Sequence, residues 1–393
     1  MRHSSFLVRW LSGGLFAAAL LVAGQPSLAQ PAEHAPAPAP LLATTPHRSA
    51  ADARIRAFRA YEESAEAYWQ LVADKRRVRT AKRRNQEPVE LDDYVMTQPP
   101  VYRGPPPPGH APRLDPAKPP LPIPVIADFL RAAAAEFHFV PDRPNSEMEF
   151  KQAYAKAAKA AGLTKDQAVR IYAFETGGNG TYDVQAGLTL RRKEARAISA
   201  AIGYNQLLST NTVGLLAQHG DKFAKALQEP LARLTEYQRA AMEQKIAALR
   251  RMIAFSRTVP NAWSEHDKLA NTTPGGIGIH AAVLDRDIGP LLQTQKLLDS
   301  VLFARMKGYR QPLTAAELEL LNFTGDGNGI DMVLMPQELR ERVPTANFFQ
   351  RSGYNRNPIA RRTGTVVALI AAIEAKMDYA SRAQGAKELA EAF

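Results

Sequence analysis

Glu175 is the residue in this sequence that is best placed for acid–base chemistry. Thr164 and Gln167 have the spacing of a capping box, in which each side chain satisfies a backbone N–H of the other, so a helix should begin at residue 165. An apolar helical face follows, and the pair Gly177-Gly178 ends the pattern soon after Glu175. We therefore expect Glu175 in the last turn of a mostly buried helix.

This position should make Glu175 a weak acid. The negative end of a helix and apolar neighbours both disfavour a carboxylate, so both raise its pKa. A carboxyl group that stays protonated near neutral pH can act as a general acid. Gln206 follows 31 residues later in the segment GYNQ, where Gly203 lets a ligand approach the backbone and Asn205 and Gln206 can hold that ligand.

Glu175-Thr176, followed by GYNQLLSTNT over 203–212, resembles the lytic transglycosylases of the lysozyme-like superfamily. In that family a Glu-Ser pair ends a helix, and a Gly-Leu-Met-Gln block forms the next wall of the sugar groove. Here Thr176 replaces the serine, Tyr204-Asn205 replaces Leu-Met, and the loop between the two motifs is longer. The resemblance covers residues 160–355, tightly at the two motifs and loosely elsewhere.

The resemblance implies a mainly α-helical, lysozyme-like catalytic domain that cuts the bond between N-acetylmuramic acid and N-acetylglucosamine in peptidoglycan. One glutamate, here Glu175, would protonate the glycosidic oxygen and then take the proton of the sugar's 6-hydroxyl, which attacks the anomeric carbon and gives a 1,6-anhydro product. No cofactor and no metal ion are expected. The residues expected to support Glu175 or to hold the glycan are Thr176, Tyr182, Gly203, Tyr204, Asn205, Gln206, Asn322 and Tyr354.

One departure from the family pattern concerns the orientation of the glutamate. The family's Ala-Tyr-Asn turn corresponds to Leu320-Leu321-Asn322, so Leu321 replaces the tyrosine that orients the catalytic residue. Tyr354 and Tyr204 are the candidates to take over that role.

Asp183 suggests a second catalytic carboxylate and the segment 326–331 suggests a calcium site, but each has a simpler interpretation. Asp183 is the nearest candidate for a second catalytic carboxylate; short Asp residues in Gly-rich loops usually make local turns, so we interpret it as a loop or substrate-contact residue. The segment 326–331 superficially resembles a calcium loop. It lacks the third ligand, and Gln337 stands where the glutamate is needed, which favours a Gly-rich turn.

Two other functions remain open from the sequence. A muramidase on the same fold would use water in place of the 6-hydroxyl. A wall-binding protein without catalytic activity is suggested by Leu321 and by the long Pro-rich segment. The products would separate the first alternative from a transglycosylase, and binding without release of muropeptides would indicate the second.

The N-terminus predicts export. Arg2 and Arg9 precede an apolar run over 11–23, and Ser27-Leu-Ala29 offers the small residues that a signal peptidase reads. The alternative, a membrane anchor, needs about 20 apolar residues, more than this run has. The absence of cysteine excludes a lipid anchor on an N-terminal cysteine. We predict cleavage after Ala29 and a periplasmic protein.

Charge indicates an anionic partner. Removal of residues 1–29 leaves 48 basic and 39 acidic residues, a net charge of +9. An exported basic protein is more suited to the carboxylate-bearing cell wall or to anionic lipid than to nucleic acid. Seven cations lie between residues 75 and 84; they are interpreted as a solvated helix end, with weak attraction to the anionic wall or membrane surface as the alternative.

The chain divides by composition. A signal peptide (1–29) is followed by a Pro/Ala-rich tether (30–47), a helical segment with a basic end (48–86), a Pro-rich extended arm (87–124) and the lysozyme-like α-helical domain (125–393). The arm holds 12 prolines in the 26 residues from Pro99 to Pro124, too many for a helix. In the last domain the predicted helices are 125–137, 147–161, 165–176, 192–201, 209–219, 221–227, 231–257, 290–307, 314–322 and 364–390.

Overall fold

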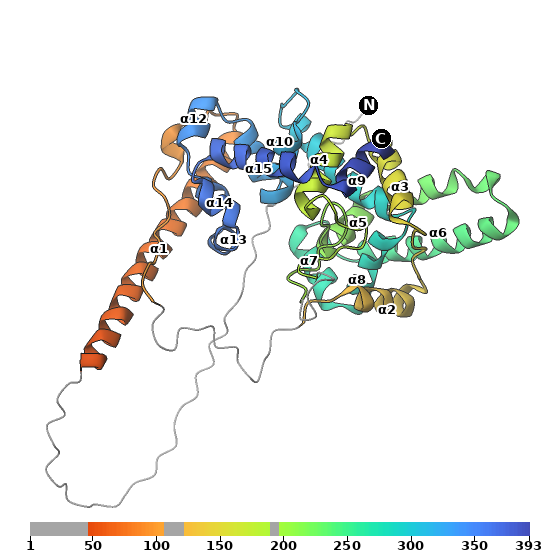
Figure 1. The fold of residues 1–393 in the computed structure, drawn as a ribbon, viewed down its shortest axis with the longest axis horizontal. Helices are drawn as coiled ribbons and strands as arrows, with labels where there is room; N and C mark the ends of the chain where they lie inside the picture. Colours follow the sequence, from red (N-terminus) through yellow and green to blue (C-terminus); the bar gives the residue numbers. More distant parts are fainter. Residues whose placement is uncertain (1–45, 106–121, 189–195) are drawn as a thin grey trace, which may run out of the picture. The chain divides into compact units, whose positions relative to one another are not determined.

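The computed structural model describes residues 46–105, 122–188 and 196–393. The predicted signal peptide, nearly all of the tether, part of the arm (106–121) and part of the loop after Glu175 (189–195) lie outside these residues. In the three described ranges the chain forms 16 α-helices and four 3-10 helices, with isolated β-bridges and no strand. The prediction of a mainly α-helical protein is confirmed (Figure 1).

The helices follow one another along the chain with short connections. Their bounds are α1 (Pro46–Arg84), α2 (Ile126–Phe137), α3 (Glu147–Ala160), α4 (Lys165–Thr176), α5 (Ser209–Gln228), α6 (Glu236–Ser256), α7 (Trp263–Thr272), α8 (Pro274–Ile279), α9 (Gly289–Met306), α10 (Ala315–Thr324), α11 (Asp326–Val333), α12 (Gln337–Arg342), α13 (Arg351–Arg356), α14 (Pro358–Thr363), α15 (Val366–Ala380) and α16 (Gln384–Ala392). The 3-10 helices are Leu91–Asp93, Leu231–Arg233, His280–Leu284 and Thr345–Phe348.

The described residues form two compact units. The larger unit contains those of Leu121–Phe349 and Tyr354–Phe393, and the smaller unit contains those of Gly14–Pro120 and Gln350–Gly353. In the larger unit one apolar core lies among α2, α5, α6, α7, α8 and the start of α9. Beside it, α4 packs against α3, α10, α15 and α16, so the helix that carries Glu175 is surrounded by other helices.

Several helix predictions are confirmed almost to the residue. α2, α3, α4, α9 and α10 begin and end within two residues of their predicted bounds. Three of them, α3, α4 and α10, have a local start signal: Ser146, Thr164 and Thr314 each accept a hydrogen bond from the backbone N–H three residues later.

Other predicted bounds were wrong for identifiable reasons. α5 continues through Gly220, because this glycine lets α6 approach closely: a Cβ there would lie 2.4 Å from Cγ1 of Ile253. The predicted helix 364–390 is interrupted between α15 and α16, where the N–H of Gly385 donates to Asn179. The described part of the predicted helix 192–201 is not helical; the N–H of Ile198 donates to the carbonyl of Ala186 instead.

The smaller unit is built on α1. The ring of Tyr102 lies against Phe58 and Tyr61, with ring centroids 5.1 and 5.3 Å apart, and the hydroxyl of Tyr68 donates to the carbonyl of Thr97 over 2.9 Å. The described beginning of the Pro-rich arm therefore lies along α1.

Part of the basic segment 75–84 holds this contact and is not a freely solvated helix end. Arg79 is buried, donates to the carbonyl of Asp93 over 2.8 Å and stacks over Tyr94. Lys82 forms an ion pair with the Asp93 carboxylate at 2.7 Å. Attraction of the remaining cations to an anionic surface stays a prediction.

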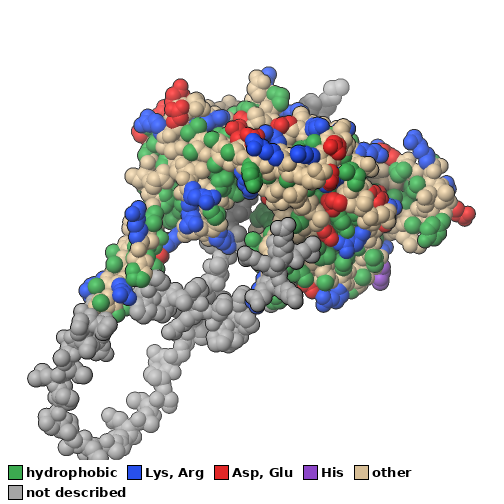
Figure 2. Space-filling view, in the orientation of Figure 1, with side chains coloured by type: hydrophobic (Ala, Val, Ile, Leu, Met, Phe, Trp, Pro, Cys, Tyr) green, Lys and Arg blue, Asp and Glu red, His purple; other side chains and the backbone are tan. Residues whose placement is uncertain are grey.

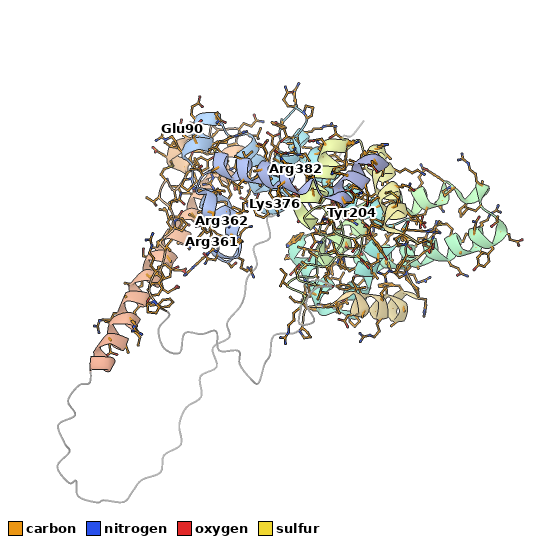
Figure 3. The ribbon with its side chains drawn as sticks, in the orientation of Figure 1. Glu90, Tyr204, Arg361, Arg362, Lys376 and Arg382 are labelled. Carbon is orange, nitrogen blue, oxygen red and sulfur yellow. The ribbon has the colours of Figure 1, made fainter. Side chains whose placement is uncertain are left out.

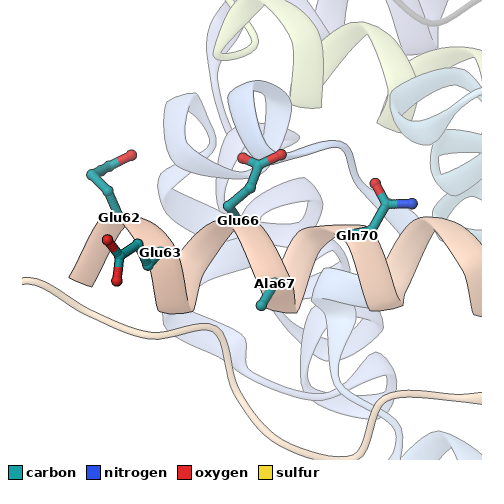
Figure 4. Close-up of a pocket in the computed structure, with 5 residues that line it drawn as sticks. All are labelled: Glu62, Glu63, Glu66, Ala67 and Gln70. Carbon is teal, nitrogen blue, oxygen red and sulfur yellow. The ribbon is translucent and has the colours of Figure 1, made fainter. Parts of the chain in front are cut away.

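An open hollow lies on the surface of α1. It is lined by Glu62, Glu63, Glu66, Ala67 and Gln70 (Figure 4). Glu62 is already paired with Arg351 at 2.7 Å. Small-molecule sites are usually enclosed and mostly apolar, so this hollow is not our candidate functional site.

No helix in residues 46–105, 122–188 and 196–393 combines the length and the apolar character needed to cross a bilayer.

The segment 326–331 forms the start of α11 and is not the Gly-rich turn that the sequence suggested. Gly325 has φ +81°, which ends α10, and Asp326 then lies in the first turn of the new helix, where a negative charge is favourable. Gly329 permits the close approach of α10 and α11, because a Cβ there would lie 2.4 Å from the Cα of Leu321.

We predict opposite effects for two alanine substitutions in α11. Gly329→Ala should lower the free energy of unfolding by about 1–3 kcal/mol, because the new methyl group would push against backbone. Gly327→Ala should leave it unchanged or raise it by up to about 1 kcal/mol, because a Cβ at Gly327 has no atom within 4 Å and alanine is the better helix former. Urea denaturation of both variants measures the difference. Equal effects would show that the contact between α10 and α11 is not tight at Gly329.

Candidate active site

α4 places Glu175 as the sequence predicted. The N–H of Gln167 donates to Thr164 Oγ1 over 3.1 Å, and the N–H of Thr164 donates to Gln167 Oε1 over 3.0 Å, so the capping box is present. The helix ends at Thr176, and Gly177 closes it with φ +69°. Glu175 therefore lies in the last turn.

α10 runs beside α4 in the same direction. The side-chain amide of Gln167, in the first turn of α4, donates to the carbonyl of Leu313, just before α10, over 2.7 Å. At the other end, Asn322 Nδ2 donates to Glu175 Oε1 over 2.9 Å. The two helices lie side by side (Figure 1), and because they meet near both their beginnings and their ends, their last turns meet at Glu175.

A second carboxyl group faces Glu175 from α10. Glu319 is fully buried, and its carboxyl is in hydrogen-bonding contact with that of Glu175. No N–H or O–H of the described residues donates to either Glu319 oxygen with good geometry. Lys376 of α15 (Figure 3) is close enough to act on both carboxyls, and its ammonium lies 3.6 Å from the ring centroid of Phe174.

The surroundings make both carboxyls weak acids. Burial raises the pKa of Glu175 to about 7; the hydrogen bond with Glu319, the charge of Lys376 and the amide of Asn322 offset only part of this rise. Burial, followed by the negative charge of Glu175, raises the pKa of Glu319 well above its ordinary value. Two facing carboxyls in such a site do not both ionise near neutral pH.

The segment GYNQ forms a tight turn between Ile202 and Leu207, whose N–H groups donate to each other's carbonyls over 3.0 and 2.9 Å. Gln206 has φ +44°, which is uncommon for a residue with a side chain. Its side-chain amide donates to the carbonyls of Gly203 and Val184 over 2.9 and 3.2 Å. Gln206 thus stabilises the turn from within; a contact with a glycan stays a prediction.

Tyr204 packs this turn against α4. Its fully buried ring touches Tyr172, with centroids 4.6 Å apart, and also Phe150 and Tyr154, both at 5.2 Å (Figure 3). Tyr172 precedes Glu175 by about one helical turn. The structure therefore joins the two motifs through an aromatic contact.

Asn205 is also buried and has protein partners. Its side-chain oxygen accepts from the hydroxyl of Tyr154 over 3.1 Å, its N–H donates to Gln293 Oε1 over 3.0 Å, and its Nδ2 donates to the carbonyl of Gln293 over 3.0 Å. The hydroxyl of Tyr204 donates to Glu147. These contacts favour a positioning role for both residues.

Thr176 and Tyr354 have hydrogen-bond partners other than Glu175. Thr176 Oγ1 donates to the carbonyl of Tyr172 within α4 over 2.7 Å. Tyr354 is buried, hydrogen-bonds to Thr345 and packs on Phe349 with centroids 6.0 Å apart. Asn322, and not a tyrosine, supplies the observed hydrogen bond to Glu175.

The loop after Glu175 is tied down in its described part, residues 177–188. Arg143 Nε donates to the hydroxyl of Tyr182 over 2.7 Å, and its Nη2 pairs with Asp183 at 2.5 Å. The N–H of Tyr182 donates to Glu147 over 3.2 Å. Asp183 also accepts from Thr181 two residues earlier, over 2.7 Å, so its contacts are those of a loop residue.

Sequence reasoning missed Glu319 and Lys376. A signal for Glu319 was present: it is a single acid between Leu318 and Leu320-Leu321, three residues before Asn322 and so on the same helical face. Lys376 has no comparable signal, since only the packing of α15 on α4 brings it to the site.

We predict that Glu175→Gln stabilises the protein in a pH-dependent way. The folded-state pKa is raised from 4.5 to about 7, so ionisation opposes folding increasingly as pH rises from 4.5 to 7 and not below that window. The variant should match the parent near pH 4 and exceed its free energy of unfolding by about 2–3 kcal/mol at pH 8. Urea denaturation at both pH values measures this. A difference independent of pH would contradict the raised pKa.

Comparisons with known proteins give no assignment of function, so the inference about function depends on the geometry of the site. No protein-family model, curated protein or solved structure matches the chain. No group of three or more His, Asp or Glu side chains within the described ranges is arranged to hold a metal ion. This site can donate one proton and take it back near neutral pH. Its members are Glu175, Glu319, Asn322 and Lys376.

Proposed function

We propose that the chain is an exported lytic transglycosylase that cuts peptidoglycan between N-acetylmuramic acid and N-acetylglucosamine. The observation that carries this proposal is the hydrogen bond from Asn322 to Glu175, because it joins the Glu175-Thr176 motif to the segment that corresponds to the family's Ala-Tyr-Asn turn. The raised pKa of Glu175 adds the acid that the reaction requires. The lysozyme-like fold belongs to the same proposal.

Glu175 would serve first as acid and then as base. Its proton moves to the glycosidic oxygen as the bond from that oxygen to the anomeric carbon breaks. The 6-hydroxyl oxygen of the sugar that carries this anomeric carbon then bonds to it, and the proton of that hydroxyl passes to the Glu175 carboxylate. One bond is exchanged for another, no water is consumed, and the enzyme regains its starting protonation state.

The contact between the Glu175 and Glu319 carboxyls argues against hydrolysis by two separate carboxylates. Such enzymes hold their carboxyls about 5–5.5 Å apart when they retain configuration and about 6.5–9.5 Å apart when they invert it. Glu175 and Glu319 are in hydrogen-bonding contact, so they act as one acid–base unit. Asp183 is engaged by Arg143 and Thr181. A muramidase with Glu175 as its sole acid remains the second candidate.

The surface charge fits a wall substrate. On the face shown in Figure 2, Lys and Arg side chains are interspersed with Asp and Glu and do not gather in one stripe. A net charge of +9 after removal of residues 1–29 gives diffuse attraction to an anionic polymer. We propose a periplasmic location and peptidoglycan strands as the partner.

The first prediction of this proposal concerns Glu175→Gln. The amide cannot donate a proton to the leaving oxygen or accept one later, so muropeptide release from purified sacculi should fall by about 10²–10⁴-fold or more. Binding to sacculi should be retained. Glu374→Gln is the matched control, because Glu374 is exposed on α15.

Release is measured at equal concentrations of folded protein, with circular dichroism as the check on folding. Equal release by Glu175→Gln and the parent would remove Glu175 from the mechanism. Binding by the parent without any release would support the inactive wall-binding alternative.

A second prediction concerns residues 177–188, the described part of the predicted 177–200 loop, which we propose lie over the substrate groove; residues 189–195 lie outside the described ranges. Arg143→Ala removes the partner of Tyr182 and Asp183, so it should loosen the loop and weaken glycan binding by about tenfold, which corresponds to about 1.4 kcal/mol. Arg131→Ala removes a comparable surface ion pair with Asp128 on α2 and serves as the control. Isothermal titration with soluble glycan fragments gives both affinities; unchanged binding in Arg143→Ala would refute this role of the loop.

A further inference from the structure

Glu319 occupies an unusual position for an acid. It is fully buried on α10, and no described residue donates a well-aligned hydrogen bond to either of its oxygens. A carboxylate without water or donors is strongly disfavoured, whereas a protonated carboxyl needs only an acceptor for its O–H. The carboxyl of Glu175 lies in contact and supplies that acceptor.

The charges around Glu175 and Glu319 also favour a protonated Glu319. Glu175 faces Glu319 from α4, and Lys376 acts on both from α15. Asp326, at the start of α11, accepts a hydrogen bond from Ser300 of α9 over 2.7 Å. Lys376 is exposed whereas Glu319 is buried, so two carboxylates with this one ammonium group would leave an uncompensated negative charge at Glu319. One retained proton makes the group of three side chains neutral.

We propose that Glu319 stays protonated throughout the reaction and donates a hydrogen bond to the Glu175 carboxylate. Glu175, which keeps some contact with solvent, is then the group that gives up and regains the mobile proton. After proton transfer its negative charge is held by two donors, the O–H of Glu319 and the Nδ2–H of Asn322, with Lys376 nearby. Glu319 acts through Glu175 and is therefore a positioning residue.

This inference rests on the proposed function only where it concerns the rate. The protonation state of Glu319 is a property of the protein alone. The opposite model has Glu319 ionised, so that its charge raises the pKa of Glu175 by repulsion. The two models predict different results for the same substitutions, because glutamine retains a neutral hydrogen-bond donor and methionine has similar size but no donor.

The first experiment measures the pH dependence of kcat/KM for muropeptide release. Because Glu175 must be protonated to act as the acid, activity should fall as pH rises through its pKa. Glu319→Gln should leave this midpoint within about half a unit of the parent's. Glu319→Met should move it upward by about one to two units, because the carboxylate loses a charge-assisted hydrogen bond.

Two outcomes would overturn the inference. A midpoint lowered by more than about one unit in Glu319→Gln would mean that a negative charge had been removed. A midpoint in Glu319→Met equal to that of the parent would mean that Glu319 only fills space. In that second case, a loss of rate in Glu319→Met that is uniform across pH would indicate a merely structural role.

The second experiment needs no substrate and no activity. Infrared spectra of the full chain at pH 7 should show the C=O band of a protonated carboxyl in the Glu175→Gln variant, and this band should vanish in the Glu175→Gln/Glu319→Gln double variant. Absence of the band in the single variant would refute a protonated Glu319 even if the protein cleaves peptidoglycan. Its presence in a protein that releases no muropeptides would support the inference while the proposed function failed.

Discussion

The site depends on two carboxyl groups, Glu175 of α4 and Glu319 of α10, that are in hydrogen-bonding contact. The constraint is that the two cannot both ionise near neutral pH. α4 ends one residue beyond Glu175, at Thr176, so the negative end of that helix adds to the cost of ionising Glu175. The site needs donors and a positive charge if either carboxyl is to lose its proton. Asn322 supplies a donor, and Lys376 from α15 supplies the charge.

Much of the surrounding structure can be understood as support for this pair. The capping box of α4 and the bond from Gln167 to Leu313 align the beginnings of α4 and α10, which brings their last turns into register. Tyr204 fixes the GYNQ turn on α4, and that turn holds Gln206 at positive φ. Strained backbone of this kind persists only where neighbouring contacts determine it, and it is often found at functional sites.

The sequence predicted the parts of the site that local signals control. A capping box and a glycine pair located the last turn of α4, and the resemblance to the family's Ala-Tyr-Asn turn indicated Asn322. Glu319 and Lys376 could not be placed in the same way, because their importance comes from packing between helices far apart in the chain. The same limit explains α5, where Gly220 signals close packing on α6 and not a helix end, and α11, where Gly329 does so against α10. The fold is mainly helical as expected, while its relation to lysozyme-like enzymes remains our proposal.

We propose that Glu175 takes the proton of the sugar's own 6-hydroxyl group and does not activate water. Digestion of purified sacculi in water enriched in oxygen-18, followed by mass spectrometry of the released muropeptides, tests this claim most directly. Our account predicts 1,6-anhydro ends that contain no heavy oxygen. Muropeptides with reducing ends labelled by oxygen-18 would show that water is the nucleophile and would contradict the account.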